Sequence, residues 1–153
     1  MFNHAESVFT DGVSDMAMSD LARHEVVTAS RDTPVSEISS MMKKEKVGSV
    51  VITNDRKPVG IVTDRDIATR AFEGKGNPRD KKAKDVMSES VCMAEEDMGL
   101  SEALERMEEE GVRRLPICGS DGKLSGIVTF DDLTEMISGE EESMARIIRS
   151  QRP

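Results

Sequence analysis

The sequence predicts a mixed α/β (α+β) fold, made of two β-α-β-β-α repeats whose sheets pack together about a pseudo-twofold axis. Three observations support this fold. One residue pattern recurs along the chain, each copy alternates strand-like and helix-like segments, and one copy is too short to stand alone. A unit of about 50 residues can hardly bury its own sheet. Packing sheet on sheet solves this and leaves a cleft on each side, where the third strand of one copy meets the first strand of the other.

The repeat is visible when the two halves of the chain are aligned at an offset of 65 residues. Asp32 then matches Asp97, and the register continues through the following helix and strand. One residue is inserted near Ser120, after which residues 60–63 match residues 126–129, both reading Gly-Ile-Val-Thr. We therefore divide the chain into an N-terminal extension (1–19), repeat 1 (20–72), a linker (73–84), repeat 2 (85–138) and a helical tail (139–153).

The elements of the first copy follow from local patterns. Val35, Ile38 and Met42 recur at helical spacing. Thr33 can cap this helix, with Pro34 at its first position. The copy is expected to hold strands at 26–28, 47–53 and 58–62 and a second helix that begins at Thr63.

The second copy repeats this order. Leu100, Leu104 and Met107 line its first helix, and the Asp-Gly pair at 121–122 is a typical hairpin turn. Its strands are expected at 91–93, 115–118 and 124–128, a second helix at Thr129, and a further helix over 140–149.

The composition excludes several classes of function. A net charge of −9 repels a nucleic-acid polymer, and the absence of Trp and Tyr removes the aromatic platforms that stack on single-stranded bases. No apolar run approaches the roughly 20 residues of a membrane helix. Residues 1–20 lack both a basic start and an apolar stretch, so no secretory signal is expected and the protein is expected to be cytoplasmic.

The few chemically reactive residues offer no catalytic or metal site. Neither a Ser-His-Asp nor a Cys-His set can be assembled, and no Walker-type loop occurs, so an enzyme is not expected. Two histidines and two cysteines show no zinc-ligand spacing. Cys92 and Cys118 are expected at the ends of neighbouring parallel strands, where a disulfide is conceivable if their Cα atoms fall within about 7 Å. The favoured interpretation is two small buried apolar residues, and a redox switch is the alternative.

The clearest local motif is Gly-Ile-Val-Thr-x-x-Asp, which occurs at 60–66 and again at 126–132. In each copy a strand ends and a helix begins, so the Thr hydroxyl and the Asp carboxylate lie on the same first turn. Such a pair suits the two vicinal hydroxyls of a ribose. The alternative is a simple capping box. Its occurrence twice, each time at a strand end, favours the ribose interpretation.

These motifs, together with Met42, Met107 and Val-Arg-Arg-Leu-Pro-Ile at 112–117, resemble a tandem CBS-domain pair (cystathionine-β-synthase domains, or Bateman module). The resemblance covers residues 20–137. Within the family, the chain is similar to small bacterial stand-alone pairs, including the hypoxic-response type. It implies a regulatory module that needs no cofactor and binds AMP, ADP, ATP or a related adenosyl ligand. The regulated partner would be a separate, unidentified protein.

The resemblance also implies a role for individual residues. Ribose would be held by Thr63 with Asp66 and by Thr129 with Asp132. Adenine would lie against Val26, Val47 and Gly48 in the Thr129 site, and against Val91 and Val112 in the Thr63 site. Phosphates would be reached by Arg65, Arg113 and Arg114. Because the first copy has Gly48-Ser49 where the second has two arginines, the two clefts are expected to differ.

Family members of this kind usually pair again as homodimers through their helices. The candidate surfaces here are the helices that carry Met41, Met42 and Met107, with the second helices that carry Ile67 and Leu133. The alternative for each methionine is a place in the core. A ligand-independent interaction protein, or a redox-responsive stress protein that uses Cys92 and Cys118, remains the alternative to the nucleotide sensor.

Overall fold

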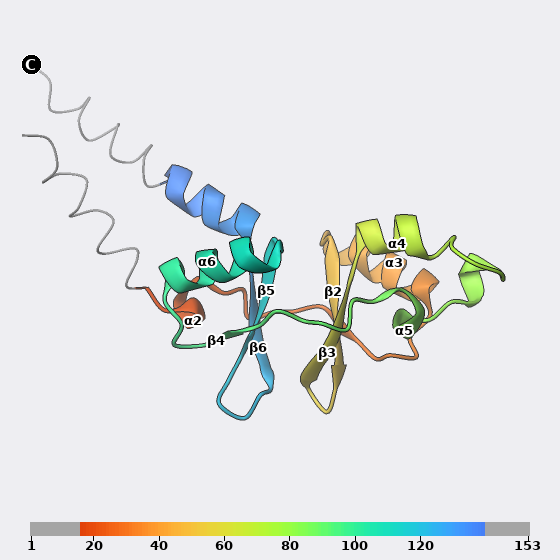
Figure 1. The fold of residues 1–153 in the computed structure, drawn as a ribbon, viewed down its shortest axis with the longest axis horizontal. Coiled ribbons are helices and arrows are strands. Elements are labelled where there is room, and N and C mark those ends of the chain that lie inside the picture. The colour runs from red at the N-terminus through yellow and green to blue at the C-terminus, as the bar shows by residue number, and fades with distance from the viewer. Residues whose placement is uncertain (1–15, 140–153) are drawn as a thin grey trace, which may run out of the picture.

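The computed structural model describes residues 16–139, so most of the expected N-terminal extension and the expected helix at 140–149 lie outside the described residues. Two three-stranded sheets are present, ordered β1-β2-β3 and β4-β5-β6. The sheets stand next to each other in the middle of the molecule, and the helices lie on their outer sides (Figure 1). The expected fold class of two α/β repeats is confirmed.

Repeat 1 supplies one sheet and two helices. Its elements are β1 (Thr28–Ala29), α3 (Val35–Glu45), β2 (Ser49–Asn54), β3 (Lys57–Thr63) and α4 (Asp64–Arg70). β1 runs parallel to β2, and β2 runs antiparallel to β3. Val50, Ile52 and Val62 on the strands pack with Ile38 and Met42 of α3 in one buried cluster.

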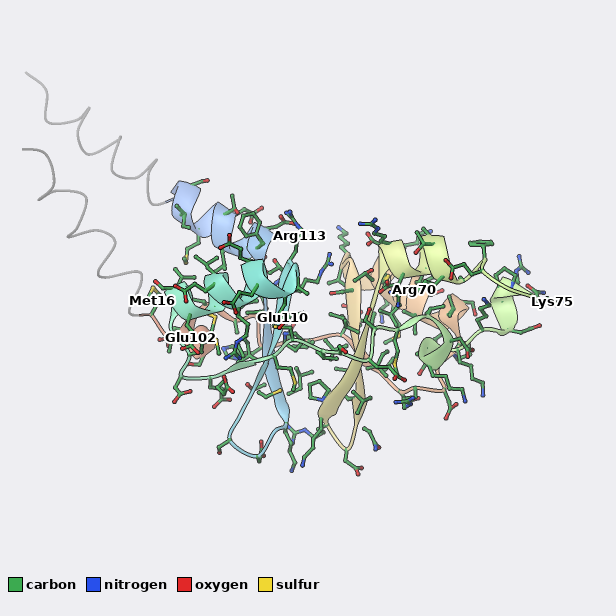
Figure 2. The ribbon with its side chains drawn as sticks, viewed as in Figure 1. Met16, Arg70, Lys75, Glu102, Glu110 and Arg113 are labelled. Atoms are coloured by element: carbon green, nitrogen blue, oxygen red, sulfur yellow. The ribbon has the colours of Figure 1, made fainter. Side chains whose placement is uncertain are left out.

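Repeat 2 has the same order. Its elements are β4 (Ala94–Glu95), α6 (Leu100–Glu110), β5 (Arg114–Cys118), β6 (Leu124–Thr129) and a helix that the structure describes over 130–139. α6 buries Leu100, Ala103 and Met107 and exposes acidic residues such as Glu102 and Glu110 on its other side (Figure 2). The amphipathic pattern of the sequence therefore predicted which face of this helix packs.

The first strand of each repeat lies later than expected. The expected strand at 26–28 is observed only at Thr28–Ala29, and the expected strand at 91–93 is observed at Ala94–Glu95. Each strand pairs with only two residues of its neighbour, Val51 and Ile52 for β1. The apolar residues just before them lie outside the assigned strands, although the Val27 carbonyl still accepts from the Val51 N–H at 3.0 Å.

The predicted cap of the first helix is also corrected. The Thr33 hydroxyl accepts from the Ser30 backbone N–H at 3.1 Å and contacts the Ser30 hydroxyl at 3.1 Å, instead of capping α3. Pro34 occupies the N-cap position, and the Val35 N–H donates to the Lys81 carbonyl at 2.9 Å. The linker therefore satisfies a helix donor that the sequence assigned to a side chain.

The two repeats exchange their first segments. The short helix α2 (Met18–Leu21) packs on the core of repeat 2, where Met18 is fully buried. In return, α5 (Ala83–Val86) begins inside the expected linker and packs on the core of repeat 1. Each repeat thus contributes buried apolar side chains to the core of the other.

Gly60 and Gly126 allow this exchange. A Cβ atom at Gly126 would lie 2.8 Å from the Ala22 Cβ and 3.0 Å from the Arg23 carbonyl oxygen. A Cβ atom at Gly60 would overlap the Met87 sulfur and lie 3.2 Å from the Ser88 carbonyl oxygen. The first residue of the Gly-Ile-Val-Thr motif is therefore small because the exchanged backbone passes over it.

The cores occupy most of the side chains expected at a dimer surface. Met42, Met107 and Leu133 are buried, whereas Met41 is half-buried. The exposed large apolar side chains of the described residues are Phe72, Met93, Phe130 and Ile137. Within residues 16–139 no helix has the length and apolar character needed to cross a bilayer.

Candidate functional site

Two clefts lie between the repeats, one on each side, and each collects residues from both. We name them the Thr129 cleft and the Thr63 cleft after the threonine at the end of the third strand. The Thr129 cleft has a volume of about 150 Å³, and the Thr63 cleft about 410 Å³. Pockets for small molecules usually enclose about 300–1,000 Å³, so only the second has the usual room.

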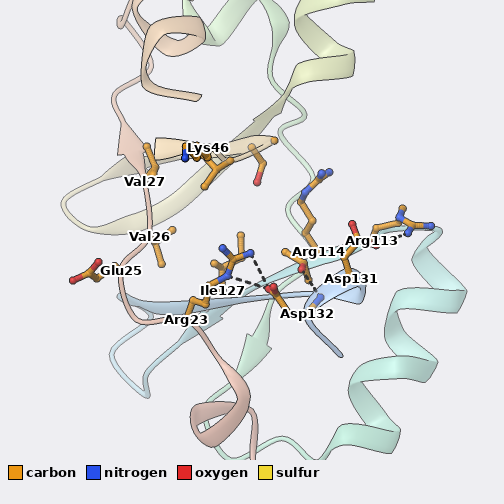
Figure 3. A pocket seen from close by; sticks show the side chains of 14 residues that line it. Arg23, Glu25, Val26, Val27, Lys46, Arg113, Arg114, Ile127, Asp131 and Asp132 are labelled. Carbon is orange, nitrogen blue, oxygen red and sulfur yellow. Dashed lines mark hydrogen bonds and ion pairs between the residues drawn. The ribbon is translucent and has the colours of Figure 1, made fainter. Parts of the chain in front are cut away.

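The Thr129 cleft joins the crossing segment of repeat 1 to the end of β6. Val26, Val47 and Gly48 line it from repeat 1, and Thr129 and Asp132 line it from repeat 2. The structure thus brings together the five residues that the sequence grouped at this site, and Figure 3 shows Val26 and Asp132 among them. The residues from the two repeats are about 80 to 100 positions apart in the sequence. They lie close together because the crossing segment runs beside β6, where Arg23 pairs with Ile127.

Asp132 has a partner that the sequence analysis missed. The Nε and Nη2 atoms of Arg23 donate to Asp132 Oδ2 at 3.1 and 2.9 Å. The Asp132 backbone N–H donates to the Thr129 hydroxyl at 3.1 Å, as in a helix cap. The carboxylate, however, faces Arg23 across the cleft (Figure 3). No local pattern marks this pair, because the two residues are 109 positions apart.

The Thr63 cleft is built from the equivalent residues. Thr63, Arg65 and Asp66 line it from repeat 1, and Val91 and Val112 line it from repeat 2. All five were expected here. The backbone bridge between Ile61 and Ser88 joins the two sides of this cleft, as the bridge between Arg23 and Ile127 does in the Thr129 cleft.

In this cleft the Thr and Asp form a complete capping box. The Thr63 N–H donates to Asp66 Oδ2 at 2.8 Å, and the Asp66 N–H donates to the Thr63 hydroxyl at 3.1 Å. The Arg70 Nε lies 3.7 Å from Asp66 Oδ1. The capping interpretation is therefore correct for this copy, and it is compatible with a ligand because a carboxylate keeps further acceptor positions.

The three arginines expected at phosphates differ in their surroundings. Arg65 lines only the Thr63 cleft, whereas Arg113 and Arg114 line both. Arg113 is exposed, pairs with Asp131 at 2.8 Å and lies 5.0 Å from the centre of the Phe130 ring. Arg114 takes part in none of the ion pairs found among residues 16–139. Arg114 is thus the better placed of the two to meet an anionic group.

Lys46 is a further cation of the Thr129 cleft that the sequence analysis missed. It ends α3 in the left-handed conformation, with φ of 54°. Repeat 2 has Gly111 at the equivalent helix end, with φ of 63°. The sequence did carry a signal for this residue: repeat 1 has a lysine where repeat 2 has a glycine. Residues other than glycine are strained at a positive φ, so a lysine at this position suggests a role for its side chain.

Cys92 precedes β4 and Cys118 ends β5, and the two residues are not opposite each other in the pairing of these strands. β4 pairs with β5 so that Cys118 is opposite Glu95, which is three residues after Cys92. Three residues of extended chain span about 10 Å. The Cys118 thiol lies 3.6 Å from the Met93 sulfur, and burial raises the pKa of both thiols. Within the described residues no group of three His, Cys, Asp or Glu side chains is arranged to hold a metal.

The family model of the CBS domain matches residues 18–73 and 83–139. An uncharacterized protein of Methanopyrus kandleri is 38% identical over 136 residues, which are 86% of this chain and 69% of that protein. The inosine-5'-monophosphate dehydrogenase of Methanocaldococcus jannaschii is 41% identical over 110 residues, 71% of this chain but only 21% of that protein.

Solved structures share the fold. A CBS-domain structure, NE2398, has a TM-score of 0.73 at 25% identity, covering 79% of this chain and 97% of that one. A CBS domain protein from Pyrobaculum aerophilum, complexed with AMP, has a TM-score of 0.69 at 23% identity and covers 77% and 90% of the two chains. The CBS domain pair of protein MJ0100, in complex with 5'-methylthioadenosine and S-adenosyl-L-methionine, has a TM-score of 0.73 at 22% identity and covers 82% and 98%. With both repeats matched in full, the chain belongs to the CBS-domain family as a tandem pair.

Proposed function

We propose that the chain is a non-catalytic regulatory module that binds an adenine nucleotide, or another adenosyl ligand, between its two repeats. The observation that carries this proposal is that Thr63 and Asp66, fixed on one helical turn, line a cleft that Val91 and Val112 of the other repeat also line. A hydroxyl and a carboxylate fixed on one helical turn suit vicinal ribose hydroxyls. The apolar side chains across the cleft suit the flat face of a base.

The choice of an adenosyl ligand rests on the relatives. Two structures of the same fold contain adenosyl ligands: AMP in one, and 5'-methylthioadenosine with S-adenosyl-L-methionine in the other. AMP, ADP and ATP carry phosphates, which Arg65, Arg113 and Arg114 can reach from the cleft walls. No separate cofactor is needed for such a role. The matched part of the dehydrogenase relatives is about a fifth of their length, which fits an attached regulatory region.

A ligand could signal to a partner by changing how the two repeats, which exchange their first segments, pack on each other. A ligand that touches both repeats favours the arrangement it fits best, and it shifts the population only by its difference in affinity between arrangements. The partner is proposed to be a separate protein. A homodimer is also proposed, with the exposed Phe130 and Ile137 as candidate contacts in place of the buried methionines.

The redox alternative has less support. The strand register separates Cys92 from Cys118, and a raised thiol pKa lowers the fraction of reactive thiolate at neutral pH. Mass analysis after mild oxidation tests it directly. A disulfide that forms readily between these two thiols would restore the redox reading.

The direct test is a thermal-shift titration with AMP, ADP, ATP, GTP, NAD and S-adenosylmethionine. Ligand at about 100 times its dissociation constant adds about 2.7 kcal/mol of stability. The matched variants are Asp66→Asn and Asp132→Asn, which keep the side-chain shape and remove the charge. A dose-dependent rise with an adenosyl ligand, reduced in one variant, supports the proposal. The absence of any shift at millimolar concentrations of all six would favour a ligand-independent interaction protein.

A further inference from the structure

The two clefts differ at one equivalent position, which holds Arg23 in one and Ser88 in the other. Arg23 exchanges backbone hydrogen bonds with Ile127, at 2.9 Å in both directions. Ser88 exchanges the same two bonds with Ile61, at 3.0 and 3.1 Å. Because Ile61 and Ile127 occupy the same place in the repeated motif, Arg23 and Ser88 are structural counterparts.

Their side chains differ in how they meet the neighbouring aspartate. Arg23, which lines its cleft, directs two donors to a single oxygen of Asp132. Ser88 makes no hydrogen bond with Asp66, whose carboxylate accepts from its own helix cap and lies 3.7 Å from the Nε atom of Arg70, a residue that does not line the Thr63 cleft. The cap holds Asp66 in place without occupying the cleft, whereas Arg23 both holds Asp132 and fills the space in front of it.

The cleft volumes agree with this difference. The Thr129 cleft, in which Arg23 faces Asp132, has about 150 Å³, and the Thr63 cleft, which Ser88 lines, has about 410 Å³. Arg23 also lines a wider hollow of about 900 Å³, which neither Thr129 nor Asp132 lines. A ligand that enters the first must displace a charge-assisted contact and a long side chain. A ligand that enters the second meets a carboxylate already in position.

We propose that Arg23 ranks the two clefts, so that an adenine nucleotide binds first and more tightly in the Thr63 cleft. This inference rests on the proposed function. Arg23 acts as an internal competitor for Asp132, and the Thr129 cleft accepts ligand only at higher concentration. Removing a competing exposed ion pair is expected to raise affinity by up to about fivefold, with a further gain from the space released.

The test exchanges the two counterparts and measures AMP binding by calorimetry. Arg23→Ser should create a second site of affinity comparable to the first, and Ser88→Arg should weaken the first site. Arg31→Ser is the matched control, because it removes an exposed ion pair, with Glu89 at 3.2 Å, outside both clefts. In an Asp66→Asn background, which isolates the Thr129 cleft, adding Arg23→Ser should tighten AMP binding, by up to about fivefold from the ion pair alone.

The possible outcomes separate this inference from the proposed function. Two equal AMP sites in the unaltered protein, unchanged by Arg23→Ser, would overturn the ranking and leave the nucleotide sensor standing. AMP binding lost more strongly in Asp132→Asn than in Asp66→Asn would also overturn it. No heat of binding in any variant, with AMP and with ATP, would overturn both. Thermal melting shows whether Ser88→Arg is folded. If it is not, the inference is still tested by the two measurements on Arg23→Ser, alone and in the Asp66→Asn background.

Discussion

The guanidinium of Arg114 lies against the backbone of Gly48. A Cβ atom at Gly48 would come within 3.2 Å of Arg114 Nη2 and 3.5 Å of Asp64 Oδ2. Arg114 belongs to repeat 2 and Gly48 to repeat 1, so the contact crosses the boundary between the two clefts. The missing side chain at position 48 leaves room for a cation that both clefts share.

The first prediction concerns this shared cation. Arg114→Ala should lower nucleotide affinity by roughly tenfold or more, because a hydrogen bond to a charged group contributes about 1.5–3 kcal/mol. Calorimetry with AMP measures it. Gly48→Ala should weaken binding less and change the unfolding free energy by under about 0.5 kcal/mol, since the atom it displaces is at the end of a flexible side chain. Arg79→Ala, outside both clefts, is the control; equal losses in Arg79→Ala and Arg114→Ala would contradict a phosphate role.

The second prediction concerns the motif glycines. Gly126→Ala should destabilise the fold by about 1–3 kcal/mol, because the added methyl meets the Ala22 side chain and the Arg23 backbone. Gly60→Ala should also destabilise the fold, because the added methyl meets the buried Met87 side chain and lies 3.2 Å from the Ser88 carbonyl oxygen; the flexible Met87 side chain can absorb only part of this overlap. Denaturant unfolding gives both values. Gly139→Ala, with no atom within 4 Å of the added Cβ, should be nearly neutral, and an equal loss there would show that the exchanged segments are not the cause.

The sequence predicted the larger part of this fold because the relevant signals are local or repeated. The hairpins, α6 and the Thr63 cap depend on neighbouring residues, and the doubled motif located both strand ends. The short strands β1 and β4 were predicted too early in the sequence. A run of apolar residues looks the same in the sequence whether it forms a strand or crosses between the repeats. Arg23 was missed because its segment was assigned to repeat 1, whereas the exchange brings it to Asp132 of repeat 2.

The third prediction exchanges the two residues that end the first helices. Lys46→Gly should raise the unfolding free energy by about 1 kcal/mol, because glycine adopts a positive φ without strain. Gly111→Lys should lower it by a similar amount. If the strain at Lys46 is retained for its charge, Lys46→Gly should also weaken nucleotide binding in the Thr129 cleft, measured in the Arg23→Ser background. A loss of stability in Lys46→Gly would show that the lysine side chain contributes packing that outweighs the strain.

The fourth prediction uses the two thiols as reporters. Burial raises the pKa of Cys92 and Cys118 above the ordinary value of 9.0. The thiol form is therefore favoured in the folded protein, any stability tied to it is complete below pH 9.0, and it is lost as the pH rises through the raised pKa values. Labelling by iodoacetamide should be slow at neutral pH and should keep rising with pH beyond 9.0, where an ordinary thiol begins to level off, because the thiolate is the reactive form.

The same labelling reports which cleft is occupied. Cys92 is half-buried and lines the Thr63 cleft, whereas Cys118 is buried and lines neither cleft. AMP should slow the labelling of Cys92 several-fold at concentrations that fill the first site and leave Cys118 unchanged, as read by mass spectrometry of the modified peptides. In Ser88→Arg this protection should require more AMP, because the first site is weakened. If calorimetry shows that one site is filled and Cys92 is still labelled at its original rate, the nucleotide is in the Thr129 cleft. The order of the two clefts would then be the reverse of the one proposed for Arg23.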